Sequence, residues 1–163
     1  MAFSLVEIPE LSGSACKIYS VAEDGAEDTL FDFFLEEMSE RFQQAVDEIW
    51  DKLLFIGKEA GARVQFFKEN EGKPGDGVVA LLNAPAFPIR LYGIRYGSVL
   101  LILGDGGYKG PTVRTWQEDA KLTKAATQMI RLSELITQRI KDRSIQIDED
   151  GTIIGELSFE EDL

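Results

Sequence analysis

Basic and tyrosine side chains alternate along one short stretch of the chain. The set comprises Arg90, Tyr92, Arg95, Tyr96, Tyr108, Lys109 and Arg114. Basic groups hold phosphates, and tyrosine rings stack on unpaired bases, so this combination suits single-stranded RNA. If residues 89–96 form a strand, Arg90 and Tyr92 share one of its faces and Arg95 takes the other. A simpler interpretation stays open, in which these are surface charges that pair with acidic side chains of the first helix.

The charge of the chain is segregated along its length. Residues 1–60 carry 4 Lys+Arg against 14 Asp+Glu, residues 61–143 carry 13 against 8, and residues 144–163 carry none against 7. The net charge is −12. Local charge sets the field at a site, so the middle segment can bind a polyanion although the whole chain is acidic. The acidic segments favour a second function, binding of a basic partner.

The residue inventory excludes several kinds of chemistry. The chain has no histidine and one cysteine, Cys16, so it has no Ser-His-Asp triad, no Cys-His pair, no His-ligated metal and no internal disulfide. An Asp-rich turn at 148–151 has Leu157 where a calcium loop needs glutamate. We therefore expect no metal and no cofactor. No apolar run approaches about 18 residues and no secretory signal is visible, which favours a cytoplasmic protein without a membrane span.

Two long amphipathic helices are predicted. In residues 29–60 apolar side chains recur every three or four positions, with Asp28 as the expected N-cap. We expect Phe34, Phe42, Ile49 and Leu53 to be buried against a sheet. A second helix is predicted over residues 115–140, where Thr115 and Glu118 have the spacing of a capping box.

Strand patterns occupy much of the remaining chain. The expected strands are residues 5–8, 17–21, 78–82, 89–96 and 98–103, followed by a hairpin of 145–147 and 152–154. Gly97 suits a tight turn between the fourth and fifth strands. Residues 104–111 are rich in glycine and are expected to form a flexible loop, and residues 158–163 an acidic, frayed tail. The prediction is one α+β domain over residues 1–157, with an antiparallel or mixed sheet of about four to six strands packed against both helices.

This order of elements resembles the RelE/ParE/HigB toxin superfamily. The resemblance covers residues 64–130, and its nearest match is the stretch IRLYGIRYGSVLLIL at 89–103 followed by Gly107-Tyr108-Lys109 and Gln117-Glu118-Asp119. A strand with arginine beside an aromatic residue, an apolar strand, a Gly/Lys loop and a helix start match that family's central hairpin. Active members are usually basic overall, whereas this chain is acidic.

The resemblance implies a small cytoplasmic toxin that cuts messenger RNA on the ribosome without metal and pairs with an antitoxin protein. It implies that Arg90 stabilises the scissile phosphate, that Lys109 is the basic residue after the last core strand, and that Tyr108 or Tyr92 is the stacking or acid group. Arg95 and Arg114 would add substrate contacts. The alternative is a non-catalytic protein-interaction domain, which could form a homodimer and would use its acidic surfaces to bind a basic partner.

Overall fold

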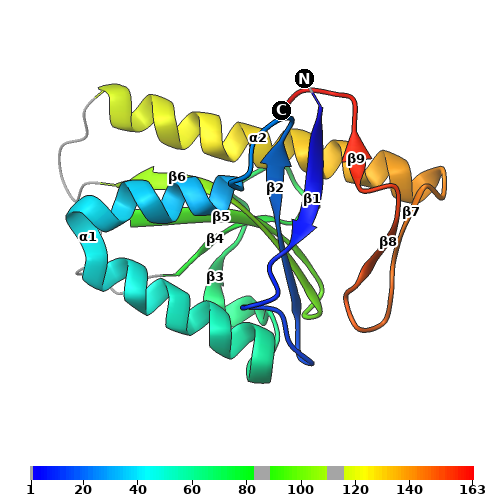
Figure 1. Ribbon diagram of the computed structural model, residues 1–163, viewed down its shortest axis with the longest axis horizontal. Helices are drawn as coiled ribbons and strands as arrows, with labels where there is room; N and C mark the ends of the chain where they lie inside the picture. The colour runs from blue at the N-terminus through cyan, green and yellow to red at the C-terminus, as the bar shows by residue number, and fades with distance from the viewer. Residues whose placement is uncertain (1, 83–88, 110–115) are drawn as a thin grey trace.

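A computed structural model describes residues 2–82, 89–109 and 116–163 of the chain. Its main element is a seven-stranded mixed sheet in the order β3-β4-β5-β6-β2-β1-β9 (Figure 1). The strands are β1 (Phe3–Glu7), β2 (Lys17–Glu23), β3 (Phe67–Lys68), β4 (Val78–Leu81), β5 (Ile89–Tyr96), β6 (Leu100–Tyr108) and β9 (Ser158–Phe159). Strands β2 and β6 run parallel, and the other neighbours are antiparallel.

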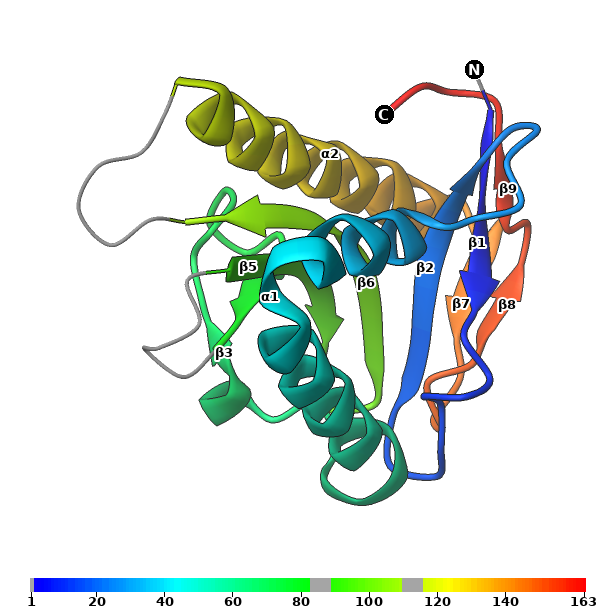
Figure 2. The same ribbon diagram turned by 60° about the vertical axis from the view of Figure 1, so that its left-hand side comes forward.

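Two helices of equal length cover the two faces of this sheet. Helix α1 (Leu30–Phe55), which continues into a π-helical turn (Ile56–Ala60), packs on one face, and α2 (Trp116–Lys141) packs on the other (Figure 2). Each face of the sheet has its own hydrophobic core, and alternate residues of β6 pack into one or the other. Leu101 and Leu103 lie in the cluster with α1, while Leu100 and Ile102 lie in the cluster with α2. Burial on both faces explains why β6 reads as a continuous apolar run.

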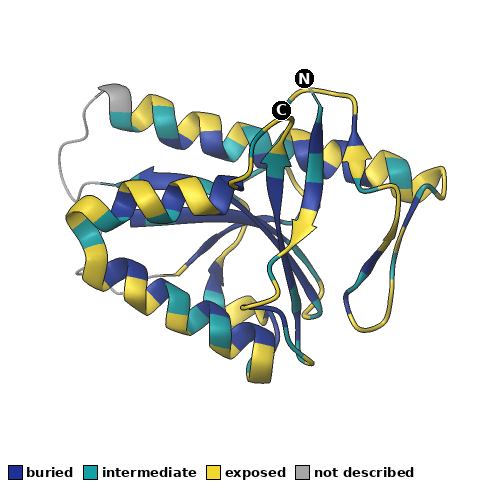
Figure 3. Ribbon diagram, in the orientation of Figure 1, coloured by how far each residue is buried: buried dark blue, intermediate teal, exposed yellow. Residues whose placement is uncertain are grey.

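The structure confirms an α+β domain with a mixed sheet and two long helices, and it has more strands than predicted. A separate two-stranded sheet of β7 (Ile145–Ile147) and β8 (Ile153–Gly155) follows α2 and confirms the expected hairpin. A short 3-10 turn (Val64–Phe66) leads into β3, which had no sequence signal. In Figure 3 the sheet strands are mostly buried, while both helices carry exposed and buried stripes.

Helix α1 departs from the prediction at its start and in its middle. Its N-cap is Thr29 rather than Asp28, because Thr29 and Asp32 form a reciprocal capping box. Phe34, Ile49 and Leu53 are buried as expected. Phe42 is only half-buried, since its backbone leaves the helical region (φ −133°, ψ 45°) and bends the helix there.

The expected flexible loop at 104–111 is wrong for its described part, because β6 continues to Tyr108. The glycines are needed for close approach rather than for a turn. A Cβ on Gly106 would lie 1.8 Å from the Arg90 carbonyl oxygen, and one on Gly104 would lie 2.7 Å from the Met129 side chain. Glycine in a strand interior often marks such a contact.

The expected frayed tail at 158–163 is wrong for its first two residues. Ser158 and Phe159 form β9, which pairs with β1 at the edge of the sheet. The Phe159 ring is fully buried and stacks on Phe3 with 4.6 Å between the ring centroids. The Arg139 guanidinium of α2 lies 3.7 Å from the Phe159 ring centroid and donates 2.7 Å hydrogen bonds to the carbonyls of Glu156 and Ser158. Ser158 and Phe159 therefore belong to the sheet.

Candidate functional site

Arg90, the expected phosphate-binding arginine, lies on β5 in a half-buried ion pair. Its Nη1 is 2.8 Å from Oε1 of Glu71, and the two side chains are only 16% and 13% exposed. The guanidinium is 6.0 Å from the ring centroid of Tyr92, which is itself buried in the cluster with α2. The structure thus places Arg90 beside Tyr92 on one face of the strand, as the alternation predicts.

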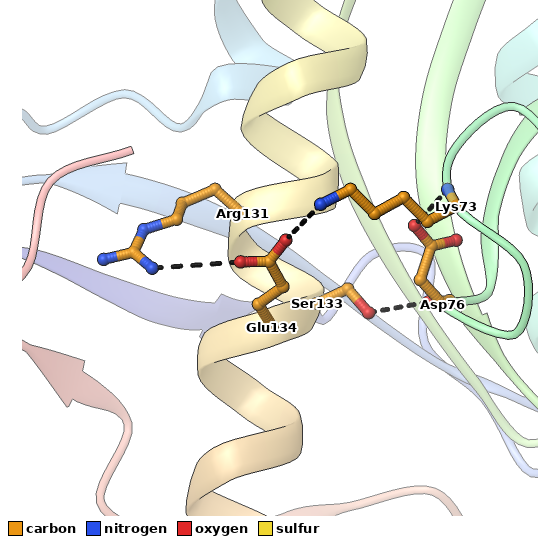
Figure 4. Close-up of polar contacts among 5 residues, drawn as sticks. All are labelled: Lys73, Asp76, Arg131, Ser133 and Glu134. Carbon is orange, nitrogen blue, oxygen red and sulfur yellow. Dashed lines mark hydrogen bonds and ion pairs between the residues drawn. The ribbon is translucent and has the colours of Figure 1, made fainter.

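The loop that carries Glu71 is fastened to α2 (Figure 4). Ser133 donates a 2.7 Å hydrogen bond to the backbone carbonyl of Asp76, and Lys73 Nζ lies 3.2 Å from Glu134. The carboxylate of Asp76 accepts a 2.7 Å hydrogen bond from the Lys73 backbone amide, which closes the turn. Arg131 lies 4.0 Å from the second oxygen of Glu134. These contacts hold Glu71 in position to neutralise Arg90.

Arg95, another predicted site residue, does not join this pair. Arg95 lies on the opposite face of β5, where its Nε donates to the backbone carbonyl of Ala62. Arg114 lies outside the described residues, as does Thr115 of the expected capping box. Arg95 therefore has a structural contact with the segment after α1 rather than a place beside Arg90.

Tyr108 ends β6 on the face covered by α1 and stacks on Phe42. The two ring centroids are 5.4 Å apart, with 7° between the planes. The Arg41 guanidinium lies 4.9 Å from the Phe42 centroid and 5.0 Å from the Tyr108 centroid. Arg41 is exposed and both rings are half-buried. We call these three residues the aromatic platform. The bend of α1 at Phe42 turns this ring toward Tyr108.

The platform and Arg90 lie at the same end of the β5–β6 hairpin but on different faces. Tyr108 pairs with Ile89, and Gly107 pairs with Arg90, so the two sites are one register position apart. Lys109 follows directly. The five predicted site residues that the structure describes are therefore not one cluster. Arg41 and Phe42 were missed, because Phe42 fits the apolar stripe of the helix and its bend has no sequence signal.

A second polar group links the two helices across the end of the sheet. Lys121 of α2 lies 3.1 Å from Asp105 of β6 and 3.0 Å from Glu37 of α1. Partial burial opposes the charged amine, but attraction to Asp105 and hydrogen bonds to both carboxylates outweigh it and raise the pKa of Lys121. This amine stays charged and acts as a tie between the layers.

Other kinds of site find no support among the residues that the structure describes. There, no three His, Cys, Asp or Glu side chains gather as metal ligands, and no helix is both long and apolar enough to span a membrane. Burial raises the pKa of the Cys16 thiol to about 12, which suppresses its reactivity. Comparisons of the chain with protein families, curated proteins and solved structures found no match.

Proposed function

We propose that the chain is a RelE-like protein that binds single-stranded RNA at the aromatic platform. The family resemblance rests on the sequence of residues 64–130 and on the predicted order of a strand, a long helical region, three closely spaced strands and a helix. The observation that carries the proposal is the stack of Tyr108 on Phe42 with the Arg41 guanidinium against both rings. Aromatic faces and arginine planes are the groups on which unpaired bases stack.

Binding is better supported than cleavage. Metal-independent cleavage, which the resemblance implies, would use Arg90 and Lys109 to stabilise the scissile phosphate and Tyr108 to protonate the leaving oxygen. Arg90 is held by Glu71 at 2.8 Å, so it would first have to exchange a carboxylate for the phosphate. In this proposal the partners are RNA or the ribosome in the cytoplasm, with an antitoxin protein as a further partner.

The electrostatics of the platform set the expected strength of binding. The basic groups at this end of the hairpin include Arg41, Arg90 and Lys109, and the whole chain carries −12. Each phosphate contact on a single strand contributes a slope of about −0.7 to the logarithm of affinity against that of salt concentration. Two or three contacts predict weak binding that falls about sevenfold to twentyfold between 50 and 200 mM salt. Stacking supplies the remainder and depends little on salt.

The test is binding of a fluorescent single-stranded RNA oligonucleotide to matched variants. Tyr108→Ala should weaken binding about 5- to 150-fold, since stacking of one base is worth about 1–3 kcal/mol. Tyr108→Phe should keep the affinity, and it should abolish any cleavage that uses the phenol as an acid. Phe55→Ala removes an exposed aromatic ring of α1 that lies farther along the helix than the platform, and it should leave the affinity unchanged. Equal affinity of wild type and Tyr108→Ala would refute the platform as the RNA site.

A further inference from the structure

The parallel pair of strands creates a crevice that RNA binding does not use. Strand β2 pairs with β6 from Lys17↔Leu100 to Tyr19↔Ile102. After this pair the chain leaves β2 for α1 on one face and leaves β6 for α2 on the other. In open sheets, ligands bind outside the carboxyl ends of parallel strands where the connections diverge in this way.

A cavity of about 440 Å³ lies at this divergence, between α1 and α2. Leu30 and Phe33 of α1 form its apolar side, and the ring-bearing side chain of Phe33 is 42% exposed. Its polar lining includes Glu23 at the end of β2, Asp105 of β6, and Lys124 of α2. Large exposed aromatic residues beside a concavity are typical anchors of protein–protein interfaces.

The charged groups of the lining are balanced, with Glu23 and Asp105 against Lys121 and Lys124, and the excess negative charge comes from the adjoining start of α1. Residues 23–40 contain eight acidic and no basic residues, and all eight acidic side chains are exposed. Lys121, at the floor, already contacts two carboxylates, so it offers little attraction to an anion. Lys124 is the other amine of the lining. An occupant rich in phosphates would be repelled here, whereas a basic one would be drawn in.

We propose that this crevice docks a basic, partly apolar segment of a partner protein. An apolar side chain of the segment covers Phe33 and Leu30, while its Lys or Arg side chains meet Glu23 and the acidic start of α1. The sequence predicted, as an alternative function, that acidic surfaces bind a basic partner, and the crevice gives that function a defined location. It is independent of RNA binding, because the aromatic platform lies farther along α1, at its bend.

The experiment measures binding of a fluorescent synthetic peptide of alternating lysine and leucine pairs to the full chain. A glutamate–leucine peptide of the same length serves as the reversed-charge probe. Wild type should bind the lysine peptide at least tenfold more tightly than the glutamate peptide. Phe33→Ala should weaken the lysine peptide about tenfold, whereas Phe55→Ala, 47% exposed on the same helix outside the crevice, should change it less than twofold.

Charge variants separate docking from general attraction. Glu23→Gln, at the crevice, and Asp47→Asn, farther along α1, each remove one exposed negative charge. Docking predicts a loss at least threefold larger for Glu23→Gln, and equal losses would overturn the proposal. Equal effects of Phe33→Ala and Phe55→Ala would overturn it too, as would loss of RNA affinity in Phe33→Ala with unchanged peptide affinity. Tyr108→Ala should leave peptide binding unchanged, so failure of the platform and failure of the crevice give different results.

Discussion

Replacing Phe159 with alanine should destabilise the domain strongly, although sequence alone places this residue in a frayed tail. The ring is fully buried between Phe3 and the Arg139 guanidinium, so its removal leaves a cavity and also costs two ring contacts. Phe→Ala at such a site costs about 3–5 kcal/mol. With a urea dependence of about 2 kcal/mol per molar, the midpoint of unfolding should fall by about 1.5–2.5 M.

The assay is urea denaturation followed by circular dichroism, with Phe55→Ala as the control. Phe55 is 47% exposed, so its truncation should cost about 1 kcal/mol or less. Arg139→Ala should destabilise as well, because the carbonyls of Glu156 and Ser158 lose their donor. If Phe159→Ala shifts the free energy of unfolding by less than about 1 kcal/mol with an unchanged urea dependence, the end of the chain is not part of the folded core and the reasoning fails.

Three further outcomes are expected. Thr29→Ala removes the capping box of α1 and should cost about 1 kcal/mol in urea denaturation, whereas Asp28→Ala should cost less than half of that; the reverse order would contradict the observed cap. Burial raises the pKa of the Cys16 thiol from 9.0 to about 12, so at pH 8 the folded protein should react with a disulfide reagent far more slowly than the protein unfolded in urea. The contribution of the buried thiol to stability should be intact below pH 9 and lost as the pH rises toward 12. Equal reaction rates would show that the thiol is accessible. Gly106→Ala should prevent normal pairing of β5 with β6, because the added Cβ would meet the Arg90 carbonyl. This variant should lower the melting temperature by more than the control variant Ala126→Gly does. A smaller effect would refute the close approach of the two strands at Gly106.

Elements that depend on local pattern could be predicted from the sequence. The apolar stripe of α1 predicted the burial of Phe34, Ile49 and Leu53, because helical spacing fixes which side chains share a face. The alternation of β5 likewise placed Arg90 and Tyr92 together and Arg95 opposite. In these cases the information lies within a few residues.

Elements that depend on distant partners could not be predicted. The glycines of β6 resemble a loop until Met129 and the Arg90 carbonyl are seen beside them. Phe159 is held in a strand by its ring contacts with Phe3 and with the Arg139 guanidinium. The contacts of the candidate site residues depend on distant partners too: the carboxylate beside Arg90 is that of Glu71, in the loop between β3 and β4, and not one of the acidic first helix.

The pairing of β1 with β9 has a consequence for how the chain reaches its native state. It joins residues 3 and 4 to residues 159 and 158, so this edge of the sheet can close only when residues such as Ser4 and Ser158, 154 positions apart, have met. The hairpins of β5 with β6 and of β1 with β2 need only local contacts, whereas the pairing of β2 with β6 needs residues 100–102. Contacts between distant residues slow folding, because a long loop must be closed before they stabilise the chain. The pairing of β1 with β9 is therefore expected to form after the local pairing of β1 with β2 and of β5 with β6.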